Sequence, residues 1–158
     1  MLSCMTTHPF PPEAVLDKPL MANLATTTPD GAPRNAPVWF LWEDGALWIP
    51  ATRGGSSARR LRHDPRCAVE VVEFDRPGGI LLHLGLRGRA EVVAMRPDLF
   101  RRLLRKYLGP EPAWNPWFID AIARMDAPDG RLIRLAPDST FTSNVSYFRT
   151  GPDLAVAP

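Results

Sequence analysis

Residues 36–51, with the sequence APVWFLWEDGALWIPA, decide the fold. The pair Asp44-Gly45 separates two apolar runs, residues 36–42 and residues 46–51. Asp-Gly between two apolar segments is the strongest local signal for a two-residue β-hairpin, because both turn residues must adopt a positive φ angle. We therefore predict two antiparallel strands over these runs.

Strand signals continue on both sides of this hairpin. Residues 20–28 form an apolar, threonine-rich run that ends at the turn Pro29-Asp30-Gly31. Residues 80–92 alternate apolar and polar side chains with the period of two that indicates a half-buried strand, and Gly85 and Gly88 are candidate positions for a bulge. Further extended segments are expected at residues 66–74, 131–136 and 139–148.

Helical signals occupy residues 57–63, 97–108 and 115–125. The second helix is amphipathic, and its basic stripe is expected to face solvent, with steering of an anionic substrate as the alternative. Because the strands follow one another through tight turns, the sheet should be antiparallel and curled into a small barrel of about six strands. The expected fold class is mainly β with short helices. The basic stripe consists of Arg101, Arg102, Arg105 and Lys106.

The composition restricts the class of protein. The 158 residues predict a single domain over residues 1–150 and a flexible tail over residues 151–158. With 19 basic and 17 acidic side chains, the net charge of +2 argues against nucleic acid as a partner. No apolar run has the length of a membrane span, and residues 1–10 carry no secretion signal, so a cytoplasmic protein is expected.

Catalytic groups supplied by the protein itself are not evident. The sequence contains no strand–Gly-x-Ser-x-Gly–helix motif and no acidic run that could share a metal. Its three histidines lack metal-ligand spacing, so no metal site is expected. Cys67 falls in an apolar strand and is expected to be a buried thiol.

The loop Gly54-Gly55-Ser56-Ser57 is the clearest candidate for a binding site. It lies between a predicted strand and a predicted helix, so it can present backbone amides, two hydroxyls and a helix N-terminus to an anion. Arg53, Arg59 and Arg60 are possible charge partners, and Arg60 is preferred if the helix turns it towards the loop. The alternative is a flexible connection without a ligand.

Aromatic side chains on the central hairpin allow two interpretations. Trp39, Trp42 and Trp48 could hold a planar ligand, but packing in the core or at a dimer interface is more common for such residues. Because residues 36–42 are apolar on both faces, one face must meet a helix, a partner chain or a ligand. His83, on the polar face of residues 80–92, is either a ligand contact or a solvated surface histidine.

Several short runs, taken in order, point to a known family. They are LAT at residues 24–26, DGAPRNAPVWFLW at 30–42, GALW at 45–48, ARRLRHDPR at 58–66 and GRAE at 88–91. With this order and spacing, residues 20–94 resemble the pyridoxamine 5'-phosphate oxidase-like, FMN-binding split-barrel superfamily. The resemblance implies a six-stranded antiparallel split barrel, a homodimer, and a flavin bound in a cleft between the subunits.

The resemblance also implies positions for the flavin. It places Pro37, Val38 and Trp39 along the isoalloxazine ring. It directs Ser56 and Ser57 to the ribityl phosphate, while His83 approaches the flavin from the long strand.

The chain departs from the family's pattern at the phosphate site. The family commonly carries a basic pair with a phosphate-binding lysine where this chain has Ser56-Ser57. Hydroxyls and helix amides can still bind a phosphate, and Arg53 or Arg60 can supply the charge by a different route. The departure leaves room for a deazaflavin, haem or no cofactor in place of FMN.

The leading hypothesis is an FMN-dependent oxidoreductase acting on a small molecule. A flavin supplies the hydride chemistry, so the protein needs only to hold the cofactor, tune it and shape the substrate cleft. Two alternatives remain: a non-catalytic protein that binds deazaflavin, haem or flavin, and a cofactor-free barrel that serves as a dimeric interaction module.

Overall fold

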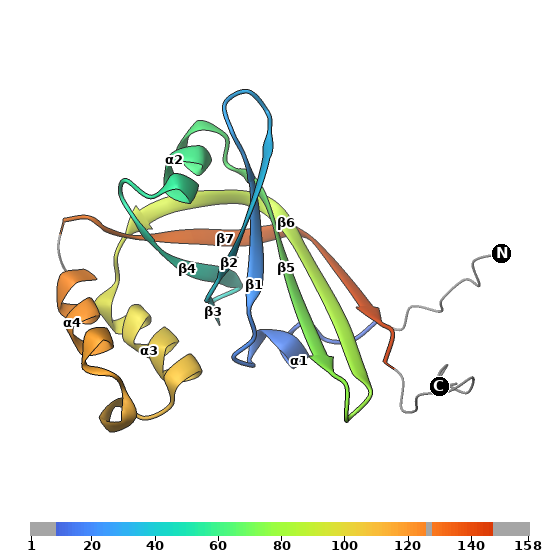
Figure 1. Ribbon diagram of the computed structural model, residues 1–158. Helices are drawn as coiled ribbons and strands as arrows, with labels where there is room; N and C mark the ends of the chain where they lie inside the picture. The colour runs from blue at the N-terminus through green and yellow to red at the C-terminus, as the bar shows by residue number, and fades with distance from the viewer. Residues whose placement is uncertain (1–8, 126–127, 147–158) are drawn as a thin grey trace.

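One antiparallel sheet of seven strands dominates the computed structural model, which describes residues 9–125 and 128–146 (Figure 1). The strand order is β2-β1-β5-β6-β7-β4-β3. The predicted mainly antiparallel fold with short helices is confirmed, with seven strands in place of six. The predicted tail, residues 151–158, lies outside the described residues. The strands are β1 Ala22–Thr27, β2 Pro33–Val38, β3 Leu41–Glu43, β4 Ala46–Thr52, β5 Arg66–Asp75, β6 Ile80–Ala94 and β7 Gly130–Asn144.

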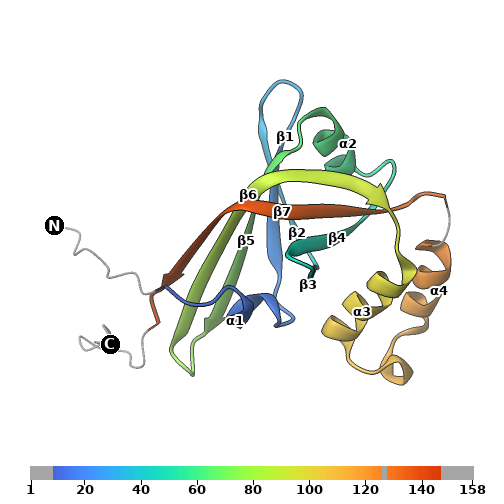
Figure 2. The ribbon, with the colours of Figure 1, turned by 180° about the vertical axis from the view of Figure 1, so that it is seen from behind.

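Short helices cover the two ends of the sheet. In Figures 1 and 2, α2 lies beside the β1–β2 hairpin, whereas α3 and α4 lie together on the side of β3 and β4. None of the helices in the described parts of the chain is both long and apolar enough to cross a bilayer. The helices are α1 Glu13–Leu16, α2 Ser56–His63, α3 Pro97–Leu108 and α4 Pro116–Met125, with a 3-10 turn at Glu111–Ala113.

The strand predicted over residues 36–42 is two strands at opposite edges of the sheet. β2 pairs with β1, and β3 pairs with β4, so the chain crosses between the edges at Trp39-Phe40. Phe40 is fully buried, and its backbone is bonded by side chains of α3 instead of by a neighbouring strand. The apolar character of both faces therefore comes from two different environments, which a single run of residues does not reveal.

The two segments predicted at the C-terminal end are one continuous strand, β7, which pairs with β6 from Leu82 to Ala94. The predicted irregularity at Gly88 is present as a register shift between Arg87 and Gly88. A Cβ atom at Gly88 would lie 3.0 Å from Leu135 and 3.2 Å from backbone atoms of Ala136 and Asp138. A side chain at this position would crowd these neighbours, which favours glycine where the long strands bend.

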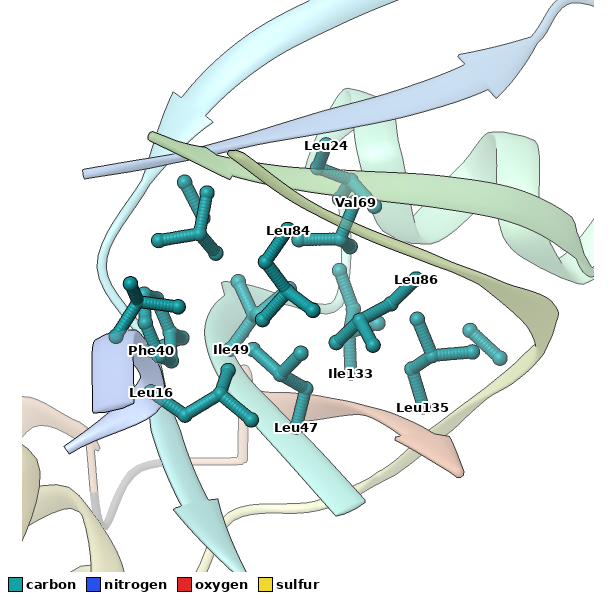
Figure 3. Packing of buried hydrophobic residues seen from close by; sticks show 14 of the residues in the cluster. Leu16, Leu24, Phe40, Leu47, Ile49, Val69, Leu84, Leu86, Ile133 and Leu135 are labelled. Carbon is teal, nitrogen blue, oxygen red and sulfur yellow. The ribbon is translucent and has the colours of Figure 1, made fainter. Parts of the chain in front are cut away.

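The core lies inside the curl of the sheet (Figure 3). Side chains at alternate positions of β1, β5 and β6 point inwards, and α1 and α2 add Leu16 and Leu61 to the same cluster. The residues between them must point outwards, because successive side chains of a strand alternate. The outer face of β1, β5 and β6 is therefore open to form a site. The inward residues include Leu24, Val69, Val71, Leu84, Leu86, Leu47, Ile49, Ile133 and Leu135.

The α3 residues Lys106 and Tyr107 bond the backbone at the crossing. Lys106 Nζ donates to the carbonyls of Leu16 at 2.7 Å and Phe40 at 3.2 Å, and it lies 3.8 Å from the centre of the Phe40 ring. Tyr107 Oη accepts from the Phe40 amide and donates to the Leu20 carbonyl. The solvated stripe predicted for α3 is therefore wrong at Lys106, because its chain reaches inwards to carbonyls that no strand satisfies.

The other members of the stripe remain at the surface. Arg102 pairs with Glu43 at 2.8 Å, and Arg101 and Arg105 pair with Glu111. These contacts hold α3 to β3 and to the turn that follows α3. Lys106 is half-buried, and this burial lowers its pKa to about 8 although the nearby Asp17 opposes the shift.

Replacing Lys106 with Met should remove a pH-dependent part of the stability. The pKa of Lys106 is about 8 in the folded chain and 10.5 for an ordinary lysine, so the unfolded chain binds more protons between these values. The contribution of Lys106 to the free energy of unfolding should therefore rise with pH in this range. In urea unfolding, the free energy of unfolding of the wild type minus that of Lys106→Met should increase by about 1–2 kcal/mol between pH 7 and 10. This figure is reduced for partial solvent screening.

Lys18→Met is the matched control, because Lys18 pairs with Glu73 at the surface. If the difference in free energy of unfolding between wild type and Lys18→Met rose equally with pH, the effect would come from removing any positive charge and not from the burial of Lys106. If the difference in free energy of unfolding between wild type and Lys106→Met did not change with pH, the Lys106 ammonium group would be hydrated in the folded chain.

Candidate functional site

A groove of about 560 Å³ lies on the outer face of β1, β2, β5 and β6. Its floor contains three small residues, Ala25, Ala68 and Gly85, at outward positions of neighbouring strands. A Cβ atom at Gly85 would meet only the Phe141 side chain, at an ordinary 3.8 Å. The small floor therefore leaves space above the sheet that the fold itself does not need.

Polar and charged side chains surround this floor. His83 Nε2 lies 2.8 Å from Glu70 Oε1, across the β5–β6 pair. The Phe141 ring meets the His83 ring edge-on at 5.6 Å between centroids. The groove thus combines a flat floor with hydrogen-bonding groups, the usual composition of a small-molecule site. The other polar lining residues are Asn23, Asn35, Arg34 and Arg87.

The start of α2 has unpartnered backbone donors. Gly55 is the N-cap residue and offers no side chain, and in the described parts of the chain no acceptor bonds the amides of residues 56–58. Gly55 also packs closely, because a Cβ atom there would lie 3.0–3.1 Å from Thr52 atoms. An anion can therefore approach this helix end without a competing carboxylate.

Arg60 turns towards the loop, as expected, and not towards solvent. Its Nε donates to Thr26 Oγ1 at 2.7 Å, and its Nη2 donates to Ser57 Oγ at 3.3 Å. Thr26 is 3% exposed, so one end of the guanidinium is anchored in the barrel. Arg59, one residue earlier on the helix, is exposed.

Arg53 and Ser56 are exposed beside this arrangement. The Arg53 carbonyl accepts a 2.7 Å bond from Arg62, and its amide donates to Asp129, which fixes the backbone ahead of the loop. The predicted phosphate residues Arg53, Ser56, Ser57 and Arg60 thus lie at one end of the barrel. Their role in binding stays a prediction.

Pro37, Val38 and Trp39 do not share one surface. Pro37 is exposed on the outer side of β2, and Val38 packs against the core. Trp39 stacks on Tyr107 at 4.7 Å between ring centroids and on Phe118 at 6.0 Å. Of the three predicted ring contacts, only Pro37 presents its side chain to the face that carries the groove.

Arg34 lies on β2, opposite the β1 residue that Arg60 contacts. It pairs in register with Thr26, the partner of Arg60, and it also lines the groove beside Asn35. The sequence interpretation did not select Arg34, Glu70, Asn23 or Asn35. The alternation of β1 and β5 could have identified Asn23 and Glu70, because both lie between core residues. Arg34 gives no comparable signal, since β2 is exposed at most positions.

The remaining reactive groups lie outside this arrangement. Cys67 is half-buried, and burial raises the pKa of its thiol to about 11, so it is a poor nucleophile at neutral pH. Over residues 9–125 and 128–146, no three histidine, cysteine or acidic side chains are grouped to hold a metal ion.

Comparisons with known proteins agree with this architecture. A sequence model of the family described as pyridoxamine 5'-phosphate oxidase matches residues 13–144. The chain therefore belongs to the pyridoxamine 5'-phosphate oxidase family. A comparison with curated proteins found no match.

Similar solved structures include proteins with flavin-related names. A conserved hypothetical protein from Mycobacterium tuberculosis aligns with a TM-score of 0.70 at 22% identity, over 87% of this chain and 86% of that chain. An F420 reductase aligns at 0.65 and 27% identity, over 85% and 98%. An FAD-binding protein from Mesorhizobium loti aligns at 0.57 and 22% identity, over 84% and 91%; at this identity the likeness supports the fold alone.

Thr26→Val should destabilise the chain while keeping the shape of the side chain. The substitution removes the acceptor of a charged donor, Arg60 Nε, in a nearly buried place. We expect a loss of about 1.5 kcal/mol and a melting temperature lower by roughly 3–6 °C in thermal unfolding. The double variant Thr26→Val/Arg60→Met should lose less than the sum of the single losses. Additive losses would mean that the two side chains act independently.

Proposed function

We propose that this protein is a flavin-dependent oxidoreductase that acts on a small molecule as a homodimer. One observation carries the proposal: Arg60 and Ser57 meet beside the unpartnered amides of α2, and Arg60 also bonds Thr26 of β1, a strand whose outer face forms part of the groove with the small-residue floor. Membership of the pyridoxamine 5'-phosphate oxidase family and the 27% identity with an F420 reductase support the same function.

The donors at α2 suit a phosphate monoester. A guanidinium has five N–H groups, and Arg60 uses two of them within the chain, so three remain for a ligand. The Ser57 hydroxyl and the amides of residues 56–58 add neutral donors. The arrangement thus offers one fixed positive charge where the family commonly has a lysine.

Each part of the site has a separate task in this proposal. A bound flavin would supply the hydride transfer itself. Arg60 and Ser57 hold the phosphate, and Pro37 borders the ring on the outer side of β2. Asn23 and Asn35 line the groove and can give and accept hydrogen bonds along the edge of a planar group, and His83 lines the same groove.

FMN is the proposed cofactor, and a deazaflavin is the second candidate. The second rests on Ser57 in place of the family's lysine and on the similarity to an F420 reductase. A protein that binds such a cofactor or haem without turnover, and a cofactor-free barrel, are the outcomes that the experiments below separate.

The 36–42 segment does not supply the apolar surface for a homodimer. The apolar residues of the 36–42 segment find partners within the chain, in the core and under α3 and α4. Other large apolar side chains are exposed. In the described residues, four of them lie on the outer face of β5 and β7 and just before β1, whereas Trp117 and Ile119 lie on α4. The four are Met21, Val72, Phe74 and Phe141.

A flavin titration tests the phosphate site. Because a charge-assisted hydrogen bond contributes about 1.5–3 kcal/mol, Arg60→Ala should weaken FMN binding by roughly 10–150-fold in fluorescence quenching at fixed salt. Ser57→Lys should restore the family's charge and tighten binding.

Arg59→Ala is the matched control, since Arg59 has the same charge but points away from the loop. Equal affinities of wild type, Arg60→Ala and Ser57→Lys would exclude the loop as the phosphate site. A Soret band in the purified protein would favour the haem-binding alternative, and a colourless protein that takes up no flavin would favour the cofactor-free barrel.

Sedimentation tests the dimer. The wild type should sediment as a dimer at micromolar concentration. The double variant Val72→Glu/Phe141→Glu should sediment as a monomer, because dimer formation would bury the new carboxylates without partners. Ile119→Glu serves as the control, since Ile119 is equally exposed but lies on α4. A stable wild-type monomer would contradict the dimer.

A further inference from the structure

Arg87 brings a positive charge to the groove that the fold itself does not use. It lies on β6, lines the groove and is exposed. In the described parts of the chain, no acidic side chain lies within ion-pair distance of its guanidinium group. We propose that Arg87 binds a carboxylate group of the substrate, so that this protein selects anionic small molecules; the inference rests on the proposed oxidoreductase function.

The strand register places Arg87 at one end of a row that crosses the groove. Arg87 lies opposite Ala68 of β5. Ala68 lies opposite Ala25 of β1, and Ala25 lies opposite Asn35 of β2. Neighbouring strands are about 4.8 Å apart, so Arg87 and Asn35 stand roughly 14 Å apart along the sheet, with only two alanines between them. A small planar molecule can therefore lie on the alanines with one end at Arg87.

A bulge in the β6–β7 pair lies directly beside Arg87. Arg87 pairs with Ser139, whereas Gly88 pairs with Pro137, so Asp138 is an extra residue on β7. Bulges often lie next to binding sites, where they change the direction of a side chain. Asp138 is exposed but is not within ion-pair distance of Arg87. Arg87 is thus without an acidic partner even on the strand that is irregular beside it.

The other charges of the groove favour an anion over a cation. Glu70 is the acidic residue of the lining, and its Oε1 atom lies 2.8 Å from His83 Nε2. Arg34 is the second arginine of the lining, and it donates a 2.9 Å hydrogen bond to the carbonyl of the adjacent Pro33. A guanidinium has five N–H groups, so Arg34 keeps donors for a ligand as well. The groove therefore has two arginines without an acidic partner in the described residues, and one carboxylate that already has a histidine beside it.

Cofactor and substrate use different parts of the groove in this scheme. The proposed function gives the side of β1 and β2 to the cofactor, so the floor on β5 and β6 is left for the substrate. This floor consists of Ala68 and Gly85, with Arg87 beside Ala68. A guanidinium binds a carboxylate through two parallel hydrogen bonds, which fix the orientation of the bound molecule and select its charge. Arg87 is therefore assigned as a specificity-determining residue.

Cinnamate and cinnamamide test the charge preference in the protein without added cofactor. The two probes share one planar, conjugated body and differ in a carboxylate against a neutral amide. In NMR titrations of the nitrogen-15-labelled wild type, cinnamate should bind about tenfold more tightly than cinnamamide, because hydrogen bonds between charged groups are the stronger ones. The largest shifts should occur at the amides of Ala68, Gly85 and Arg87.

Two substitutions of Arg87 separate its charge from its shape. Arg87→Gln should remove the preference for cinnamate and leave the affinity for cinnamamide unchanged. Arg87→Lys should keep only part of the preference, because an ammonium group retains the charge but not the planar pair of donors. Equal affinities of the wild type for the two probes, or binding of neither, would overturn the substrate class.

Arg89→Gln is the matched control. Arg89 is exposed two residues further along β6 and does not line the groove. Its substitution should change the affinity for cinnamate by less than about threefold, since only screened, long-range attraction is lost. An equal loss in Arg89→Gln and Arg87→Gln would assign the preference to the general charge of this surface and would overturn the role of Arg87.

Two further measurements exclude other sources of the anion. FMN and riboflavin differ by the phosphate, so a loss of affinity for FMN but not for riboflavin in Arg87→Gln would assign Arg87 to the cofactor. Conversion of a wild-type dimer to a monomer by Arg87→Gln would assign it to the contact between subunits. We expect neither change. Failure of the wild type to bind both FMN and deazaflavin would overturn the proposed function, whatever the result with cinnamate.

Discussion

The structure depends on the hydrogen bonds that α3 gives to the crossing at Trp39-Phe40. There the chain leaves one edge of the sheet and begins the other, so its peptide groups have no strand partner while Phe40 is fully buried. Buried peptide groups without hydrogen-bond partners destabilise a fold. Lys106 and Tyr107 supply the partners for the Phe40 carbonyl and amide. Because these side chains also bond Leu16 and Leu20, the same two residues hold the N-terminal segment against both edges.

This arrangement explains why the outer face of the sheet is available for a ligand. The core is filled from inside the curl, and α1, α2 and α3 close its ends. The outward side chains of β1, β5 and β6 are therefore not needed to fill the core, and small residues at these positions leave a groove. At the end of the barrel nearest α2, the contact of Arg60 with Thr26 ties the proposed phosphate site to the first strand. The proposed cofactor and substrate sites thus stand on one rigid sheet.

The two parts of the site differ in how visible they were in the sequence. The loop 54–57 is conspicuous, because glycines and serines between a strand and a helix are a local signal. The pair of Glu70 with His83 is not, since it depends on the register of two strands. The alternation of residues 80–92 placed His83 on a polar face, and the family resemblance then directed it to the flavin, but neither pointed to Glu70. Trp39 shows the opposite case, because a tryptophan in a ring-binding motif lies against Tyr107 and Phe118 on helices that follow much later in the chain.

The sequence by itself determined the elements whose causes are local. Asp44-Gly45 defined the central hairpin, alternation defined β6, and Pro97 with Gly109 bounded α3, because turn geometry, side-chain period and helix capping act over a few residues. Only the tertiary structure decided that residues 36–42 divide between two sheet edges, that Lys106 is half-buried against backbone carbonyls, and that His83 meets Glu70. These outcomes depend on which distant backbone and side-chain groups come together, and strand pairing across long separations leaves no periodic trace in the chain.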